Sequence, residues 1–138
     1  MKKILVITHG TFALGIKESI KVIMGDNSMI DTICVTESCS PAEIKGKIAE
    51  YMESVLKDIP VIALTDIPGG STTASIAPFL LNYTNLYVVS GLNLAIMLAV
   101  AIQAVEEGDI KENIRKIIDD AKTTMLFVND VFSGNSSI

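Results

Sequence analysis

The sequence is poor in several side chains on which many enzymes rely. It holds one histidine (His9), one arginine (Arg115), two cysteines and no tryptophan. A single histidine excludes any mechanism that needs two histidines from this chain. The longest apolar stretch, Leu94 to Val105, is too short to span a bilayer and instead predicts a buried helix. The apolar run that follows Lys2 and Lys3 has only four residues, which predicts a strand rather than a signal peptide.

The two cysteines give no sign of a disulfide framework. Cys34 falls inside an apolar run typical of a strand, and Cys39 falls in a loop. A redox pair is one interpretation, but two reduced thiols are the simpler one. We therefore expect a cytoplasmic protein.

The bulk composition is that of one soluble globular domain. The chain has 138 residues, of which 49% are hydrophobic and 20% charged, and its formal net charge is −5. This acidic balance argues against nucleic acid and against an anionic membrane, but it suits a basic protein partner. We expect a single domain over residues 1–130 and a polar tail over 131–138.

Strand and helix patterns alternate along the chain. Four short apolar runs predict strands at Ile4–Thr8, Ile30–Val35, Pro60–Thr65 and Leu86–Ser90. Helical spacing predicts helices over about 13–24 with Gly25 as C-cap, from Ser40 to about Leu56, over Thr72–Asn82, from the turn at Asn93 to near Glu107 with Gly108 beyond it, and after Asp109. In the second of these, Glu43 is expected to reach back to the amide of Ser40. The β-prone piece Met125–Val128 predicts a last short strand.

This alternation predicts an α/β fold, a doubly wound parallel sheet with helices on both faces. For this size the flavodoxin-like strand order 2-1-3-4 is favoured, in which strands 1 and 3 are neighbours. Ligands bind such sheets at the carboxyl ends of the strands, where the strand order reverses. His9 ends the first predicted strand and Asp66 follows the third. The two residues should therefore lie side by side at the predicted site.

A histidine beside a carboxylate suits a carrier of phosphoryl groups. The carboxylate of Asp66 would hold one ring nitrogen of His9 in a fixed tautomer, leave the lone pair of the other nitrogen free to attack, and stabilise positive charge on the ring. The alternative is a surface histidine that meets a carboxylate by accident. The position at the predicted switch point of the sheet favours the first interpretation.

The turn after Asp66 could surround an anion. Gly69 and Gly70 permit positive φ angles and close approach of backbone amides, and the following helix would aim its N-terminus at the same place. The hydroxyls of Ser71, Thr72 and Thr73 would add donors. Asn93, after the fourth strand, is either a helix N-cap or a part of the site. The remaining acidic residues lack histidine or cysteine neighbours, so we predict no metal and no cofactor.

Three segments resemble the mannose-family IIA component of the bacterial sugar phosphotransferase system. They are Val6-Ile7-Thr8-His9-Gly10, Leu64-Thr65-Asp66-Ile67-Pro68-Gly69-Gly70-Ser71 and Ser90-Gly91-Leu92-Asn93-Leu94, and together with Gly15 they keep the order and spacing of the family over nearly the whole chain.

The resemblance implies a histidine phosphocarrier. His9 would accept a phosphoryl group from the phosphocarrier HPr and pass it to a IIB partner for sugar uptake, with the membrane components IIC and IID involved only indirectly. Asp66 would orient His9, and the phosphoryl group would be surrounded by Gly10, Gly69, Gly70, Ser71 and Thr72, with Ser90 and Asn93 as further candidates. The resemblance also implies a homodimer in which a C-terminal strand, here Met125–Val128, crosses to the other subunit.

The sequence departs from the family pattern at two places and leaves other functions open. Thr72-Thr73-Ala74 stands where the family usually has proline, an aromatic residue and asparagine, and Ala95 stands where it usually has proline. These changes bear on the sugar branch and on partner docking. A regulatory IIA-like domain and the related subunit that serves dihydroxyacetone kinase are the alternatives. A histidine phosphatase would need a second histidine and several arginines, which the chain lacks.

Overall fold

A computed structural model of the protein describes residues 1–133. Its centre is one parallel sheet of four strands, β1 (Lys3–His9), β2 (Ile30–Val35), β3 (Val61–Thr65) and β4 (Leu86–Ser90), in the order β2-β1-β3-β4. This is the flavodoxin-like order that the sequence predicts. The middle of each central strand, Ile4–Ile7 in β1 and Val61–Leu64 in β3, is wholly apolar because both of its faces are covered.

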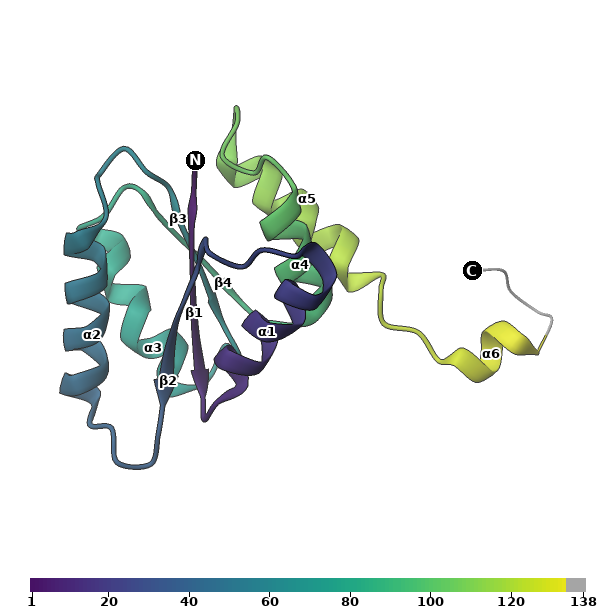
Figure 1. The fold of residues 1–138 in the computed structure, drawn as a ribbon, viewed down its shortest axis with the longest axis horizontal. Helices are drawn as coiled ribbons and strands as arrows, with labels where there is room; N and C mark the ends of the chain where they lie inside the picture. The colour runs from purple at the N-terminus through teal and green to yellow at the C-terminus, as the bar shows by residue number, and fades with distance from the viewer. Residues whose placement is uncertain (134–138) are drawn as a thin grey trace.

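Helices cover the two faces of the sheet (Figure 1). The helices α1 (Phe12–Met24), α4 (Leu94–Ile102) and α5 (Ile110–Lys122) lie on one face, and α2 (Pro41–Ser54) and α3 (Ser71–Ile76) lie on the other. Each face has its own core: Ile4, Val6 and Leu64 point to the first, and Leu5, Ile7 and Ala63 point to the second. This alternation is the period of two that a strand buried on both sides must show.

Helix caps confirm several predicted boundaries. The side chain of Ser40 accepts a hydrogen bond from the Glu43 amide at the start of α2, and that of Asp109 caps α5 in the same way. Gly25 ends α1 in the left-handed conformation, with φ of 81°. One detail is different: the Glu43 carboxylate accepts a hydrogen bond from the Ser40 hydroxyl, where the sequence predicted a bond to the Ser40 amide.

Two predicted helices end or change early. The helix predicted to reach Asn82 stops at Ile76 and continues as a 3₁₀ turn, η1 (Ala77–Leu81). Pro78 is the reason, because it has no amide to donate to the helix. The helix predicted to end near Glu107 stops at Ile102, since the chain turns there and buries Val105 in the core. Tertiary packing therefore overrides the helical pattern at this point.

The predicted strand Met125–Val128 is wrong for the described chain. Residues 125–127 have no regular structure, and Val128 begins a short helix, α6 (Val128–Phe132), which lies away from the rest of the molecule (Figure 1). A strand forms only beside a partner strand, and none lies next to this segment in the described chain. The helix runs across residue 130, where the sequence placed a boundary; of the predicted tail 131–138, residues 134–138 lie outside the described residues.

Within residues 1–133, no helix combines the length and apolar character needed to cross a membrane.

Candidate phosphoryl-transfer site

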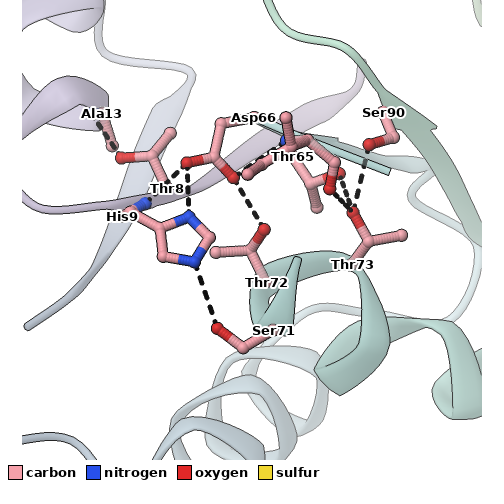
Figure 2. A network of polar contacts seen from close by, with 10 residues as sticks. Thr8, His9, Ala13, Thr65, Asp66, Ser71, Thr72, Thr73 and Ser90 are labelled. Atoms are coloured by element: carbon pink, nitrogen blue, oxygen red, sulfur yellow. Dashed lines mark hydrogen bonds and ion pairs between the residues drawn. The ribbon is translucent and has the colours of Figure 1, made fainter. Parts of the chain in front are cut away.

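The site lies where β1 and β3 end side by side. The parallel register pairs Ile7 with Thr65, so the segments that follow β1 and β3 leave the sheet at the same edge. Asp66 Oδ2 accepts two hydrogen bonds from His9, one from its backbone amide and one from Nδ1, each at 2.8 Å (Figure 2). The predicted pairing of the two residues is thus present in the structure.

The turn after β1 fixes where His9 stands. Gly10 has a φ of +61°, which favours glycine, and its amide donates to the carbonyl of Val35 at the end of β2. The buried hydroxyl of Thr8 accepts a hydrogen bond from the amide of Ala13 and so ties the start of α1 to β1. Because the Gly10 amide is already used, it is not a free donor beside His9.

The carboxylate of Asp66 is held as an anion by four hydrogen bonds. Besides the two from His9, its Oδ1 accepts one from the Thr72 hydroxyl at 2.7 Å and one from the Ile67 amide at 3.0 Å. Burial alone would raise the pKa of Asp66, but the bonds from the His9 amide, the Thr72 hydroxyl and the His9 ring outweigh it and lower the pKa to about 2. This stabilising effect is complete above the ordinary value of 3.8 and is lost as the pH falls towards 2.

An ionised Asp66 determines the tautomer of His9. Because both carboxylate oxygens only accept, the proton shared at the 2.8 Å contact belongs to Nδ1. In the neutral ring Nε2 is then an acceptor with its lone pair facing away from Asp66. The Ser71 hydroxyl lies 3.2 Å from Nε2 and is the donor of that contact (Figure 2). The His9 side chain is 44% exposed while that of Asp66 is 13% exposed, so the ring is accessible from solvent and the carboxylate is sheltered.

Gly70 is needed at the site for space rather than for its conformation. Its φ of −90° and ψ of 169° are open to any residue, so the expected positive φ is wrong here. A Cβ at Gly70, however, would lie 2.9 Å from Cε1 of His9, whereas one at Gly69 would meet nothing within 4 Å. The Gly70 amide donates to the carbonyl of Ile67. This amide is therefore not free to donate to an anion, although the sequence predicted such donors in the turn after Asp66.

The structure places three other predicted site residues in structural roles. The hydroxyl of Thr72, expected to face an anion, is buried and donates to Asp66 instead. Asn93 caps α4 by accepting from the amide of Ile96, which agrees with its N-cap interpretation. The Ser90 hydroxyl contacts Thr73 Oγ1 at 3.0 Å and makes no bond to His9 or Asp66 within the described part of the chain.

The sequence indicated Thr73 and Ser90 as candidate site residues but did not predict that they meet Thr65 in a small hydroxyl cluster behind the site. Thr73 Oγ1 donates to the carbonyl of Ile67 and lies 2.7 Å from Thr65 Oγ1. Since Thr73 has one hydroxyl proton, the hydroxyls of Thr65 and Ser90 donate to it. The cluster fixes the first turn of α3 to the ends of β3 and β4 (Figure 2). The one signal in the sequence was a hydroxyl, Thr65, at the end of an otherwise apolar strand.

An open groove runs beside His9 and leads to the start of α2. Its lining includes His9, Gly10, Thr36, Cys39 and Ser71. Among residues 1–133, no three histidine, cysteine or carboxylate side chains gather closely enough to hold a metal ion.

Gly70→Ala should displace the His9 ring, because its Cβ would overlap Cε1 and the ring is held at both nitrogens. We expect the imidazole ¹⁵N signals to shift and the free energy of unfolding to fall by about 1–3 kcal/mol, the usual cost of overpacking. Gly46→Ala, in α2 and with open space around its Cβ, is the control and should leave these signals unchanged. Unaltered imidazole signals in Gly70→Ala would contradict this account of Gly70.

Known proteins share both the sequence pattern and the fold. A family model described as the PTS system fructose IIA component, where PTS denotes the phosphotransferase system, matches residues 3–118. The mannose/sorbose-specific IIA subunit of the phosphotransferase system from Enterococcus faecalis is 23% identical, with a TM-score of 0.83 over 92% of this chain and 95% of that one. No curated protein matches the sequence.

Two further solved structures agree. The phosphotransferase system component EIIA from Streptococcus agalactiae is 22% identical, with a TM-score of 0.82 over 94% of this chain and 99% of that one. The PTS IIA protein associated with the fucose utilization operon from Streptococcus pneumoniae is 23% identical, with a TM-score of 0.79 over 95% and 96% of the two chains. At these identities the structures establish the fold, while the family model covers most of the sequence. The chain therefore belongs to the mannose-family IIA components of the sugar phosphotransferase system.

Proposed function

We propose that His9 is a phosphohistidine carrier, which takes a phosphoryl group from phospho-HPr and gives it to a IIB partner. Membership of the family implies phosphotransferase activity in general. The observation that carries the specific proposal is the bond from His9 Nδ1 to an ionised Asp66, which puts the unprotonated nitrogen at Nε2 of a partly exposed ring, where the Ser71 hydroxyl is its one hydrogen-bonding contact among the described residues. An imidazole in this state is a nucleophile that needs no general base.

The transfer step follows from this geometry. Nε2 of His9 attacks the phosphorus of phospho-HPr in line; a new N–P bond forms as the donor's N–P bond breaks, and the donor imidazole keeps the electron pair of that bond. The His9 ring then bears positive charge beside the phosphoryl dianion, and the Asp66 carboxylate stabilises that charge through Nδ1–H. In the transfer to IIB, the N–P bond of His9 breaks as a new bond from phosphorus to IIB forms, and His9 is the leaving group.

The region around Nε2 supplies polar contacts for the transferred group. The Ser71 hydroxyl is 3.2 Å from Nε2 and can turn to donate to a phosphoryl oxygen once the lone pair is used. The amides of Gly69 and Ser71 are the other proposed donors; Gly70 contributes by its lack of a side chain. We place this reaction in the cytoplasm. The net charge of −5 on this chain favours docking of a basic carrier protein. The membrane components take part only through IIB.

His9→Ala should abolish phosphoryl uptake, because no other histidine is present in the chain. The measurement is mass spectrometry of the intact protein after mixing with phospho-HPr, with acid lability of the adduct to identify an N–P bond. The wild-type protein is the positive control. Phosphoryl uptake by His9→Ala at the wild-type level would refute the proposal. Labelled wild-type protein that passes nothing to any cognate IIB would favour the regulatory role over transport.

Asp66→Ala should slow phosphoryl uptake by about a hundredfold or more while the fold survives, because ring orientation and tautomer are both lost. The single-turnover rate from phospho-HPr is the measurement, with far-ultraviolet circular dichroism as a check on folding. A matched control is Asp58→Ala, which removes an exposed carboxylate in the loop before β3, at the opposite end of that strand from Asp66. An unchanged rate in Asp66→Ala would remove this carboxylate from the mechanism.

We further propose that the protein is a homodimer in which the C-terminal segment packs on a second copy. Large apolar side chains lie exposed along this segment: Met125, Leu126, Phe127, Val128 and Phe132 are each 50–90% exposed. Such a run of apolar surface is rare unless another molecule covers it. Its pairing as an exchanged strand stays a prediction.

Leu126→Asp combined with Phe127→Asp should therefore convert the dimer into a monomer, since each charge would have to be buried at the interface. Sedimentation equilibrium over a range of protein concentrations is the measurement. Leu56→Asp, an equally drastic change at an exposed site after α2, is the control and should remain dimeric. A monomeric wild-type protein would refute the proposal.

A further inference from the structure

We propose that Thr72 is a positioning residue for phosphoryl transfer, which acts by holding the carboxylate of Asp66 against the His9 ring. This inference rests on the proposed function of His9. Its physical basis is a buried side chain with a single hydrogen-bonding duty: Thr72 is fully buried and its hydroxyl donates to Asp66 Oδ1 at 2.7 Å. A buried hydroxyl of this kind cannot touch a phosphoryl group at the exposed Nε2.

The bonds to Asp66 divide into two kinds. The amides of His9 and Ile67 come from the backbone, so every sequence with this turn would provide them. The Thr72 hydroxyl comes from a side chain on α3, a different element, and it is the shorter of the two bonds to Oδ1. Without it, Oδ1 would keep only the Ile67 amide at 3.0 Å. The carboxylate plane could then rotate more freely, and Oδ2 turns with it.

Thr72 also couples the two ends of the His9 ring. Its neighbour Ser71 contacts Nε2, while Thr72 holds the carboxylate that binds Nδ1 (Figure 2). Ser71 and Thr72 both belong to the first turn of α3. The bond from Thr72 to Asp66 therefore helps to set the distance between this turn and the His9 ring. A loss of this bond should affect the angle at which Nε2 meets phosphorus, and small errors of alignment are costly in an in-line reaction.

The charged state of Asp66 supplies a direct signature of the bond. The groups that face the carboxylate are the imidazole and amide of His9 from β1, the amide of Ile67 and the hydroxyl of Thr72 from α3. Among them only His9 is titratable. A hydroxyl that donates to the anion favours the charged form. Its removal should therefore move the titration of Asp66 to higher pH.

The experiment compares Thr72→Val and Thr72→Ser in the full chain. Valine keeps the shape of threonine and loses the hydroxyl; serine keeps the hydroxyl. We expect Thr72→Val to take up a phosphoryl group from phospho-HPr about tenfold more slowly and to show an upward shift in the ¹³C titration midpoint of Asp66. Thr72→Ser should restore the rate and the midpoint to near the wild-type values. Rescue by serine is what a purely space-filling role would not give.

Controls separate the possible failures. Thr32→Val makes the same chemical change on the edge strand β2, and both readouts should stay at wild-type values. If Thr72→Val does not fold, Thr72→Ala serves in its place, because it also lacks the hydroxyl and introduces no larger group. A wild-type rate together with a wild-type Asp66 titration in the variant without the hydroxyl would overturn the inference, as would a failure of serine to rescue.

The two arms also distinguish this inference from the proposed function. The titration of Asp66 is measured on the unphosphorylated protein and needs no partner. If wild-type protein takes up no phosphoryl group, the proposed function fails and Thr72 has no reaction to assist. If wild-type protein is labelled normally and Thr72→Val is labelled at the same rate, only the role of Thr72 is refuted.

Discussion

The hydrogen bond between His9 Nδ1 and the ionised Asp66 is the contact on which the proposed chemistry of this protein depends. Imidazole is a nucleophile only at a nitrogen that carries no proton, and an anionic neighbour decides which nitrogen that is. Asp66 can be that anion although it is partly buried, because four donors converge on its two oxygens. Two of these donors are backbone amides, and their positions follow from the parallel register of β1 and β3. The register of the sheet thus helps to keep Asp66 ionised, and the ionised Asp66 determines the tautomer of His9.

The strand order explains why the side chain of His9 is open to solvent and that of Asp66 is sheltered. In the order β2-β1-β3-β4, the helix after β1 leaves to one face of the sheet and the helix after β3 leaves to the other (Figure 1). The tips of the two central strands are therefore left uncovered between them. His9, at the end of β1, reaches into this opening, while Asp66 lies behind it against α3. The proposed transfer needs this asymmetry, since a protein donor must reach the ring nitrogen of His9 and water should not reach the carboxylate of Asp66.

Much of this arrangement could be predicted from the sequence, because it rests on short-range signals. Apolar runs of strand length predicted the first and last residues of β2 and β4. The predicted strand order then placed His9 beside Asp66, as the structure shows. What the sequence could not show depends on contacts between distant segments. The inward direction of Thr72 and the approach of Gly70 to His9 are properties of packing. The early end of α4 reflects the burial of Val105, and residues 125–127 have no partner strand within the described chain.

The first turn of α3 shows how a weak element can hold a precise site. A helix of six residues with no side-chain cap has little stability of its own. Three consecutive hydroxyls compensate: Ser71 contacts the ring, Thr72 the carboxylate, and Thr73 the ends of the two neighbouring strands. Thr72 and Thr73 also stand at two of the positions where the sequence departs from the family pattern. Because both side chains are directed into the protein, these two departures reorganise the support of the site. Of the three substituted positions after Ser71, Ala74 is exposed and is the one that can alter a docking surface directly.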